Sequence, residues 1–233
     1  EGFFRPGIVG AGEQCLRNGE LMTFSIGTCR VTVGFLFVAM LAFFLLLDTD
    51  GMAGPGIAAA ALHECGHLAV LFAVGEPPKA IRLNPFGVEI VRRGEPRGYL
   101  REAEVDLAGP CVNLLVGGTC MLLLGTGAKK FAIANLMIGA MNLLPIDPLD
   151  GGQALHALLC LRLREETAAR VGTAVSVLAL LPLAIAGFLL LLRSRYNFSL
   201  LLVGCYLMLL LLLKRRRFGS ERAFPREKTF PCR

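Results

Sequence analysis

The chain has 233 residues, of which 55% are hydrophobic and 18% charged, and its formal net charge is +6. This composition excludes a disordered or highly charged chain and is typical of a membrane protein. The basic residues flank apolar segments and are not interleaved with aromatic residues, so the positive charge indicates membrane topology and not nucleic-acid binding.

The first 30 residues predict a cytoplasmic lead-in. Residues 1–22 are rich in glycine and charge and show no signal-peptide pattern, whereas residues 23–30 alternate briefly as in a short strand. The first residue is Glu1 and not methionine, so whether the N-terminus is complete is left open.

Six apolar segments predict an all-α polytopic membrane protein with six transmembrane helices: 31–47, 56–75, 108–124, 131–144, 171–192 and 198–213. Between the second and third segments, residues 79–93 predict a short membrane-associated β-hairpin, with a solvated loop as the alternative. The expected domains are the lead-in 1–30, a six-helix domain 31–213 and a basic cytoplasmic tail 214–233. All but four of the 24 lysines and arginines then fall on the side of both termini, which the positive-inside rule assigns to the cytoplasm.

The second apolar segment contains a metal-binding pattern. His63 and His67 are four residues apart, so on a helix both imidazoles project from one face and can reach a single metal ion. Glu64 lies about 100° further around the helix and could deprotonate a water molecule on that metal. Ionisable groups inside an apolar run are costly, which favours a functional site. The alternatives to a metal site are a chance match to the pattern or the exposed polar face of a soluble helix. This helix has no polar face.

A catalytic zinc ion requires a third protein ligand, and the chain offers few. Asp150 is the preferred candidate because Gly151 and Gly152 follow it in a segment whose prolines should break the fourth helix. His156 is expected to be an interfacial histidine and not a ligand, and the role of Asp147 is left open. The eight cysteines form no CxxC pair and predict small buried side chains, not a metal site or disulfide framework.

These motifs resemble those of the site-2 proteases, the intramembrane zinc metalloproteases of peptidase family M50. The resemblance rests on the HECGH pattern at 63–67, on NxxPxxPxDG at 142–151 and on AGPxxN at 108–113. Residues 83–87 are most similar to the bacterial branch that processes sporulation sigma factors. We expect this chain to lack the C-terminal regulatory domain that this branch often carries.

The resemblance implies that His63, His67 and Asp150 bind Zn²⁺ and that Glu64 is the general base. It also places Asn142 near the site, where the amide would stabilise the transition state or form a packing hydrogen bond; Asn113 is expected to be a packing amide.

The implied function is regulated intramembrane proteolysis in a bacterial cell membrane. Expected partners are the lipid bilayer and a membrane protein substrate, such as a pro-sigma factor, an anti-sigma factor or a remnant signal peptide, with no direct nucleic acid. The alternatives are a membrane metal transporter and a proteolytically silent adaptor. Substrate identity, oligomeric state and gating are not determined by the sequence.

Overall fold

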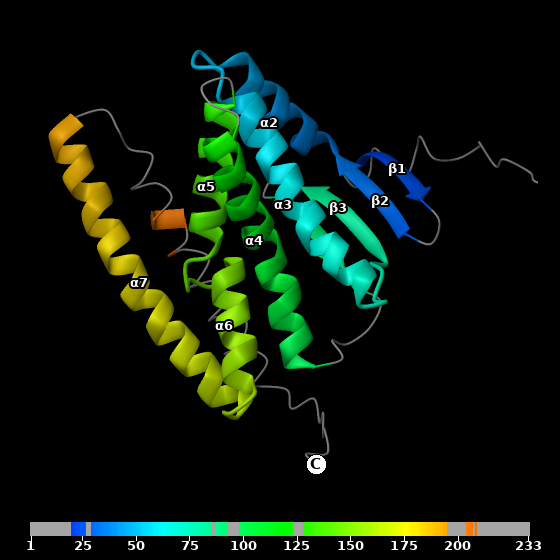
Figure 1. The fold of residues 1–233 in the computed structure, drawn as a ribbon, viewed down its shortest axis with the longest axis vertical. Helices are drawn as coiled ribbons and strands as arrows, with labels where there is room; N and C mark the ends of the chain where they lie inside the picture. Colours follow the sequence, from blue (N-terminus) through cyan, green and yellow to red (C-terminus); the bar gives the residue numbers. More distant parts are fainter. Residues whose placement is uncertain are drawn as a thin grey trace, which may run out of the picture. The chain divides into compact units, whose positions relative to one another are not determined.

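The computed structural model describes residues 20–26, 29–84, 87–92, 98–123, 128–194, 204–206 and 208. The chain divides into two compact units, residues 1–97 with 108–139 and residues 98–107 with 140–233. Figure 1 labels the helices α2 to α7 and the strands β1 to β3.

The first unit contains a four-stranded sheet. Its strands are β1 (Glu20–Ile26), β2 (Cys29–Gly34), β3 (Ala80–Asn84) and β4 (Gly87–Val91), in that spatial order. The pairs β1–β2 and β3–β4 are antiparallel, and β2 pairs with β3 in parallel. The β-hairpin predicted within residues 79–93 is therefore confirmed, and the single strand expected at 23–30 is replaced by two strands.

The start of the first predicted membrane helix is a strand. Residues 31–34 belong to β2, where the β-branched Val31, Thr32 and Val33 pair with β3. The helix that follows, α2 (Phe35–Leu46), has 12 residues, fewer than the ~20 that cross a bilayer. The prediction of a membrane helix over 31–47 was therefore wrong in its first turn and in its length.

The helix α3 (Ala53–Ala73) begins and ends at specific polar contacts. The carboxylate of Asp48 accepts hydrogen bonds from the backbone N–H groups of Met52, at 2.9 Å, and Ala53, at 2.8 Å. At the other end Gly75 has a φ of +75°, and the N–H of Glu76 donates to the carbonyl of Leu71 over 2.9 Å. This αL termination satisfies carbonyls that the helix leaves open, so both bounds of α3 follow from local chemistry.

The cap at Asp48 predicts a pH-dependent stability. Backbone hydrogen bonds from Ala53 and then Met52 hold the pKa of Asp48 below its ordinary value. A lowered folded-state pKa means that this stabilisation is present above the unfolded-state pKa, about 3.9, and is lost as the pH falls through the folded-state value. We expect Asp48→Ala to lower the unfolding temperature in detergent by about 2–4 °C at pH 7, with a smaller difference from wild type at pH 3. Asp50→Ala, which keeps the backbone carbonyl bound to Lys130, is the control; an equal loss for both variants at pH 7 would contradict the prediction.

The first unit also contains parts of two further helices. It holds residues 108–123 of α4 (Tyr99–Leu123) and residues 129–139 of α5 (Lys129–Asn142). A Cβ built on Gly139 would lie 3.0 Å from the side chain of Leu114 and 3.1 Å from the carbonyl oxygen of Pro110. Glycine at this position therefore lets α5 approach α4 closely, as small residues do between membrane helices.

The second unit is built on a helical hairpin. The helices α6 (Asp150–Cys160) and α7 (Glu165–Ser194) contact each other, and the first turns of α4 pack on α6 through Ala103, Ala154 and Ala157. Residues 143–149 are not helical between α5 and α6, which confirms the predicted break. A helix directly after the break was not predicted. The sixth predicted span, 198–213, lies outside the described residues apart from 204–206 and 208.

Three helices of the described part of the chain are long and apolar enough to cross a membrane: 53–73, 99–123 and 165–189. They correspond to the second, third and fifth predicted spans. The 14 residues of α5 are fewer than a typical span requires. The chain is thus a mostly helical, multi-pass membrane protein with a small sheet, and the count of six spans stays a prediction.

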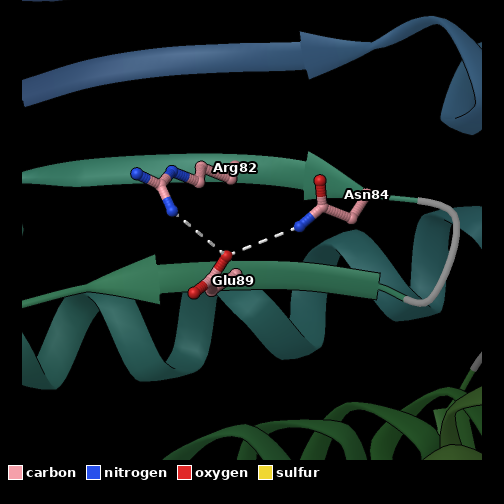
Figure 2. A network of polar contacts seen from close by, with 3 residues as sticks. All are labelled: Arg82, Asn84 and Glu89. Carbon is pink, nitrogen blue, oxygen red and sulfur yellow. Dashed lines mark hydrogen bonds and ion pairs between the residues drawn. The ribbon is translucent and has the colours of Figure 1, made fainter. Parts of the chain in front are cut away.

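A polar network joins the two strands of the β3–β4 hairpin (Figure 2). One carboxylate oxygen of Glu89 lies 3.8 Å from a guanidinium nitrogen of Arg82 and accepts a 3.5 Å hydrogen bond from the amide of Asn84. Arg82 and Glu89 are direct cross-strand partners, and both side chains are 56% exposed. Such an exposed pair contributes little stability but favours this register over a slipped one.

Candidate metal centre

Two buried histidines on α3 form the centre of the candidate site. His63 is 6% exposed and His67 is 8% exposed. Their Nε2 atoms are 3.1 Å apart and their rings meet edge to face. In a tetrahedral zinc site with zinc–nitrogen bonds of about 2.0–2.1 Å, two ligand nitrogens are about 3.3–3.4 Å apart. The observed separation therefore fits two ligands of one zinc ion.

Glycines bring α4 directly against this pair. A Cβ built on Gly109 would overlap His67 Nε2 and lie 2.8 Å from His63 Cε1. In turn, a Cβ built on Gly66 would lie 2.9 Å from the carbonyl oxygen of Ala108. The imidazoles thus occupy the space that a side chain at residue 109 would fill. This contact explains why both rings are buried and have little room to rotate.

Glu64 follows His63 on the same helix and is half-buried. The next residue, Cys65, is exposed. Residues 63, 64 and 65 therefore go from the buried face of α3 to its exposed face. Glu64 therefore lies between the buried His63 and the exposed Cys65 on α3.

Asp150 is the first residue of α6 and is half-buried. The two glycines after it pack on the backbone of the preceding loop. A Cβ on Gly151 would overlap the carbonyl of Leu143, and one on Gly152 would lie 2.5 Å from the backbone nitrogen of Asp147. The first turn of α6 is therefore seated on the loop 143–149. Asp150 belongs to the second unit and the histidine pair to the first.

The remaining candidate residues have distinct surroundings. Asn142 is the half-buried last residue of α5. His156, on α6, has both ring nitrogens 3.9 Å from the sulfur of Cys160. Asp147 lies in the loop, and its backbone N–H donates to a side chain of α7. Asn113 is fully buried, but among the described residues its amide has no hydrogen-bond partner, so the packing hydrogen bond expected for it is not found there.

Sequence reasoning missed two residues that shape this region. Gly109 was part of the 108–113 pattern, yet its contact with the imidazoles depends on how α4 packs on α3. Ser176 on α7 is 1% exposed and binds the loop before Asp150. A single serine in an apolar helix carries no sequence signal of such a role.

Comparison with solved structures shows a known fold. The structure is similar to the site-2 protease from Methanocaldococcus jannaschii, with a TM-score of 0.57 and 20% identity, over 92% of this chain and 99% of that one. The two chains therefore share a fold.

Sequence comparisons find a similar family. The sequence model of peptidase family M50 matches residues 126–184, which include α5, α6 and the first part of α7. A zinc metalloprotease of M. jannaschii is 30% identical over 138 residues, 52% of this chain and 39% of the relative. Stage IV sporulation protein FB of Bacillus subtilis is 31% identical over 147 residues, 55% of this chain and 51% of the relative. The chain is therefore similar to peptidase family M50 and to these relatives, and it spans about two fifths to half of their length.

Proposed function

We propose that this protein is an intramembrane zinc metalloprotease that hydrolyses peptide bonds of membrane-embedded or membrane-associated proteins. The observation that carries the proposal is the buried pair of imidazole nitrogens, 3.1 Å apart, within an apolar helix long enough to span a bilayer. Ionisable side chains in such a helix are expensive and mark functional sites. The match of residues 126–184 to family M50 and the name of a relative as a zinc metalloprotease support the same activity.

The zinc ligands in this proposal are His63, His67 and Asp150. Each offers one ligand atom, an imidazole nitrogen or a carboxylate oxygen, of a kind that zinc binds. Three protein ligands leave a fourth position open, as a catalytic site needs. When bound there, zinc would lower the pKa of a coordinated water to about 7 and polarise the scissile carbonyl.

Glu64 is proposed as the proton carrier. Its carboxylate takes a proton from the attacking water and gives it to the nitrogen of the leaving amine, so one group serves both halves of the reaction. Its place directly after His63 on α3 keeps it beside the ligands without requiring it to be one.

Asn142 is proposed to act on the substrate. As the last residue of α5 it ends the helix just before the loop that leads to Asp150. Its neutral amide could donate a hydrogen bond to the substrate carbonyl as negative charge develops, an effect of about 10²–10³ in rate where it occurs. The alternative is a packing hydrogen bond within the helix bundle.

The sheet suggests how a substrate is held. A helical substrate has its carbonyls already hydrogen-bonded, so it must be extended before cleavage. Because β4 is the last strand in the sheet order, one of its edges has no partner strand among the described residues, and that edge could pair with an extended substrate backbone. Pairing would keep the scissile bond accessible while satisfying the peptide groups that the bilayer cannot solvate.

The positive-inside rule supports an orientation with both termini in the cytoplasm. His67 lies eight residues before Gly75, so the zinc would be about 12 Å from the cytoplasmic end of α3. We propose that substrates reach the site from that side in a bacterial cell membrane. Pro-sigma factors, anti-sigma factors and remnant signal peptides are the candidate substrates.

The proposal is tested by counting zinc. Purified protein in detergent is expected to contain one zinc ion per chain by mass spectrometry, and His67→Ala and Asp150→Ala are each expected to lose most of it, because two remaining ligands bind zinc weakly. His156→Ala, which removes a histidine outside the proposed set, is the control and should retain full zinc. Unchanged zinc content in either ligand variant would disprove the ligand set.

A further inference from the structure

The loop before Asp150 is bound by a single hydroxyl group of α7. Ser176 is 1% exposed, and its Oγ accepts a hydrogen bond of 3.0 Å from the backbone N–H of Asp147. The hydroxyl proton faces two carbonyl oxygens, that of Gly172 at 2.8 Å and that of Pro145 at 3.4 Å. One side chain thus contacts both ends of the Pro145–Asp147 segment, and all of these residues belong to the second unit.

The apolar contacts around this hydroxyl hold the same segment. Ile146, between the two residues that Ser176 contacts, is completely buried and packs against Leu180, one turn further along α7. Leu144, Leu149, Ala179 and Leu183 surround this pair. The loop therefore packs on α7 through the hydrophobic contact of Ile146 with Leu180, and Ser176 supplies a polar contact beside it.

On its other side the loop supports the first turn of α6. The backbone of Gly152 packs so tightly on Ile146 and Asp147 that a Cβ there would lie 2.5 Å from each of their backbones. The N–H of Leu149 donates to the carbonyl of Ile146 over 2.7 Å. The Ser176 hydroxyl therefore contacts the Ile146–Asp147 peptide group on one side. On its other side the same peptide group packs against Gly152, in the first turn of α6.

We propose that Ser176 is a positioning residue that sets the place of Asp150 as a metal ligand, an inference that rests on the proposed function. The part-buried N–H of Asp147 needs an acceptor, and a residue at membrane depth cannot obtain one from bulk water. Without the hydroxyl the loop must shift to satisfy that N–H, and the first turn of α6 shifts with it. Groups that orient metal ligands typically change metal affinity by about 10–100-fold when removed.

Thr173 provides a matched control on the same helix. Its hydroxyl donates to the carbonyl of Ala169 over 2.8 Å, the same contact to its own helix that Ser176 makes with Gly172. Among the described residues, Ser176 is the more buried of the two, and its hydroxyl also contacts the loop, which that of Thr173 does not. Comparing Ser176→Ala with Thr173→Ala therefore isolates the loop contact from the loss of a hydroxyl in α7.

The experiment measures zinc affinity of purified full-length protein by competition with a chelator of known affinity, together with the unfolding temperature of the zinc-free protein. Ser176→Ala is expected to weaken zinc binding about 10–100-fold, whereas Thr173→Ala should bind as wild type does. Ser176→Thr, which keeps the hydroxyl, should restore most of the affinity. If Ser176→Ala fails to fold, Ser176→Cys retains the size but only a weak acceptor, and it should show an intermediate affinity.

Equal zinc affinity in Ser176→Ala and Thr173→Ala would overturn the positioning role, even if Ser176→Ala unfolds at a lower temperature. The same conclusion would follow if Ser176→Cys bound zinc as tightly as wild type. These failures are distinct from failure of the proposed function, which would be seen as unchanged zinc binding in Asp150→Ala.

Discussion

Substitution of Glu64 by Gln is expected to stop cleavage while leaving zinc bound. Glutamine has the same shape as glutamate but cannot accept the proton of the attacking water, and removing a general base costs about 10²–10⁴ in rate. The imidazole pair of His63 and His67 is unchanged by this substitution, so one zinc ion per chain should remain. The measurement compares membrane proteins that accumulate uncut in cells carrying the variant with those in wild-type cells, and the zinc content of both purified proteins.

The control for this variant is Cys65→Ala. Cys65 is the next residue on α3 and is exposed, so this substitution should leave both cleavage and zinc unchanged. Retained cleavage by Glu64→Gln would remove the general-base assignment. Loss of zinc from that variant would instead show that Glu64 contributes to metal binding. The accumulated proteins would also identify the substrates.

Gly109→Ala is expected to abolish zinc binding and, with it, cleavage. A methyl group at this position would overlap His67 Nε2 and lie 2.8 Å from His63 Cε1, closer than carbon atoms pack at about 3.5–4.0 Å. Either the imidazoles must rotate, which disturbs nitrogens that are now 3.1 Å apart, or α4 must move away from α3, which removes the backbone that packs against both rings. We expect a loss of cleavage at least as large as that of Glu64→Gln, accompanied by loss of zinc.

Gly118→Ala is the matched control on the same helix. A Cβ built on Gly118 has nothing within 4 Å, and alanine favours a helix over glycine by about 1 kcal/mol. This variant should therefore bind zinc normally and unfold at the same or a higher temperature. Zinc stoichiometry of both variants is measured in detergent. Normal zinc content in Gly109→Ala would show that the site tolerates a methyl group and that α4 does not confine the histidines.

Several features could be predicted from the sequence because they depend on local chemistry. The spacing of His63 and His67 requires only a helix to bring the two imidazoles together, and α3 is that helix. The β3–β4 hairpin was predicted from alternating residues around a turn, and the break after Asn142 from Pro145 and Pro148. Similarity to family M50 was predicted from the same motifs, and the family model matches residues 126–184.

Other features depended on partners that are distant in the sequence. The apolar run from Val31 was interpreted as a membrane helix, yet residues 31–34 form a strand because β3 lies beside them, with Arg30 opposite Ala80. Pairing of this kind joins segments about fifty residues apart, and no local pattern specifies it. For the same reason the helix α6 was missed: two glycines follow Asp150, and their low helix propensity is outweighed by the close packing on the loop that only glycine permits.

The sequence by itself determined which groups can bind a metal and act as a base, because ligand chemistry and helical spacing are properties of residue types and short intervals. The tertiary structure alone decided what confines those groups. The backbone of α4 at Gly109 lies so close to the two imidazoles that a side chain there would meet them, and the hydroxyl of Ser176 contacts the loop before Asp150. Such contacts arise where helices pack, and a glycine or a serine in an apolar helix has the same sequence signature whether or not it makes them.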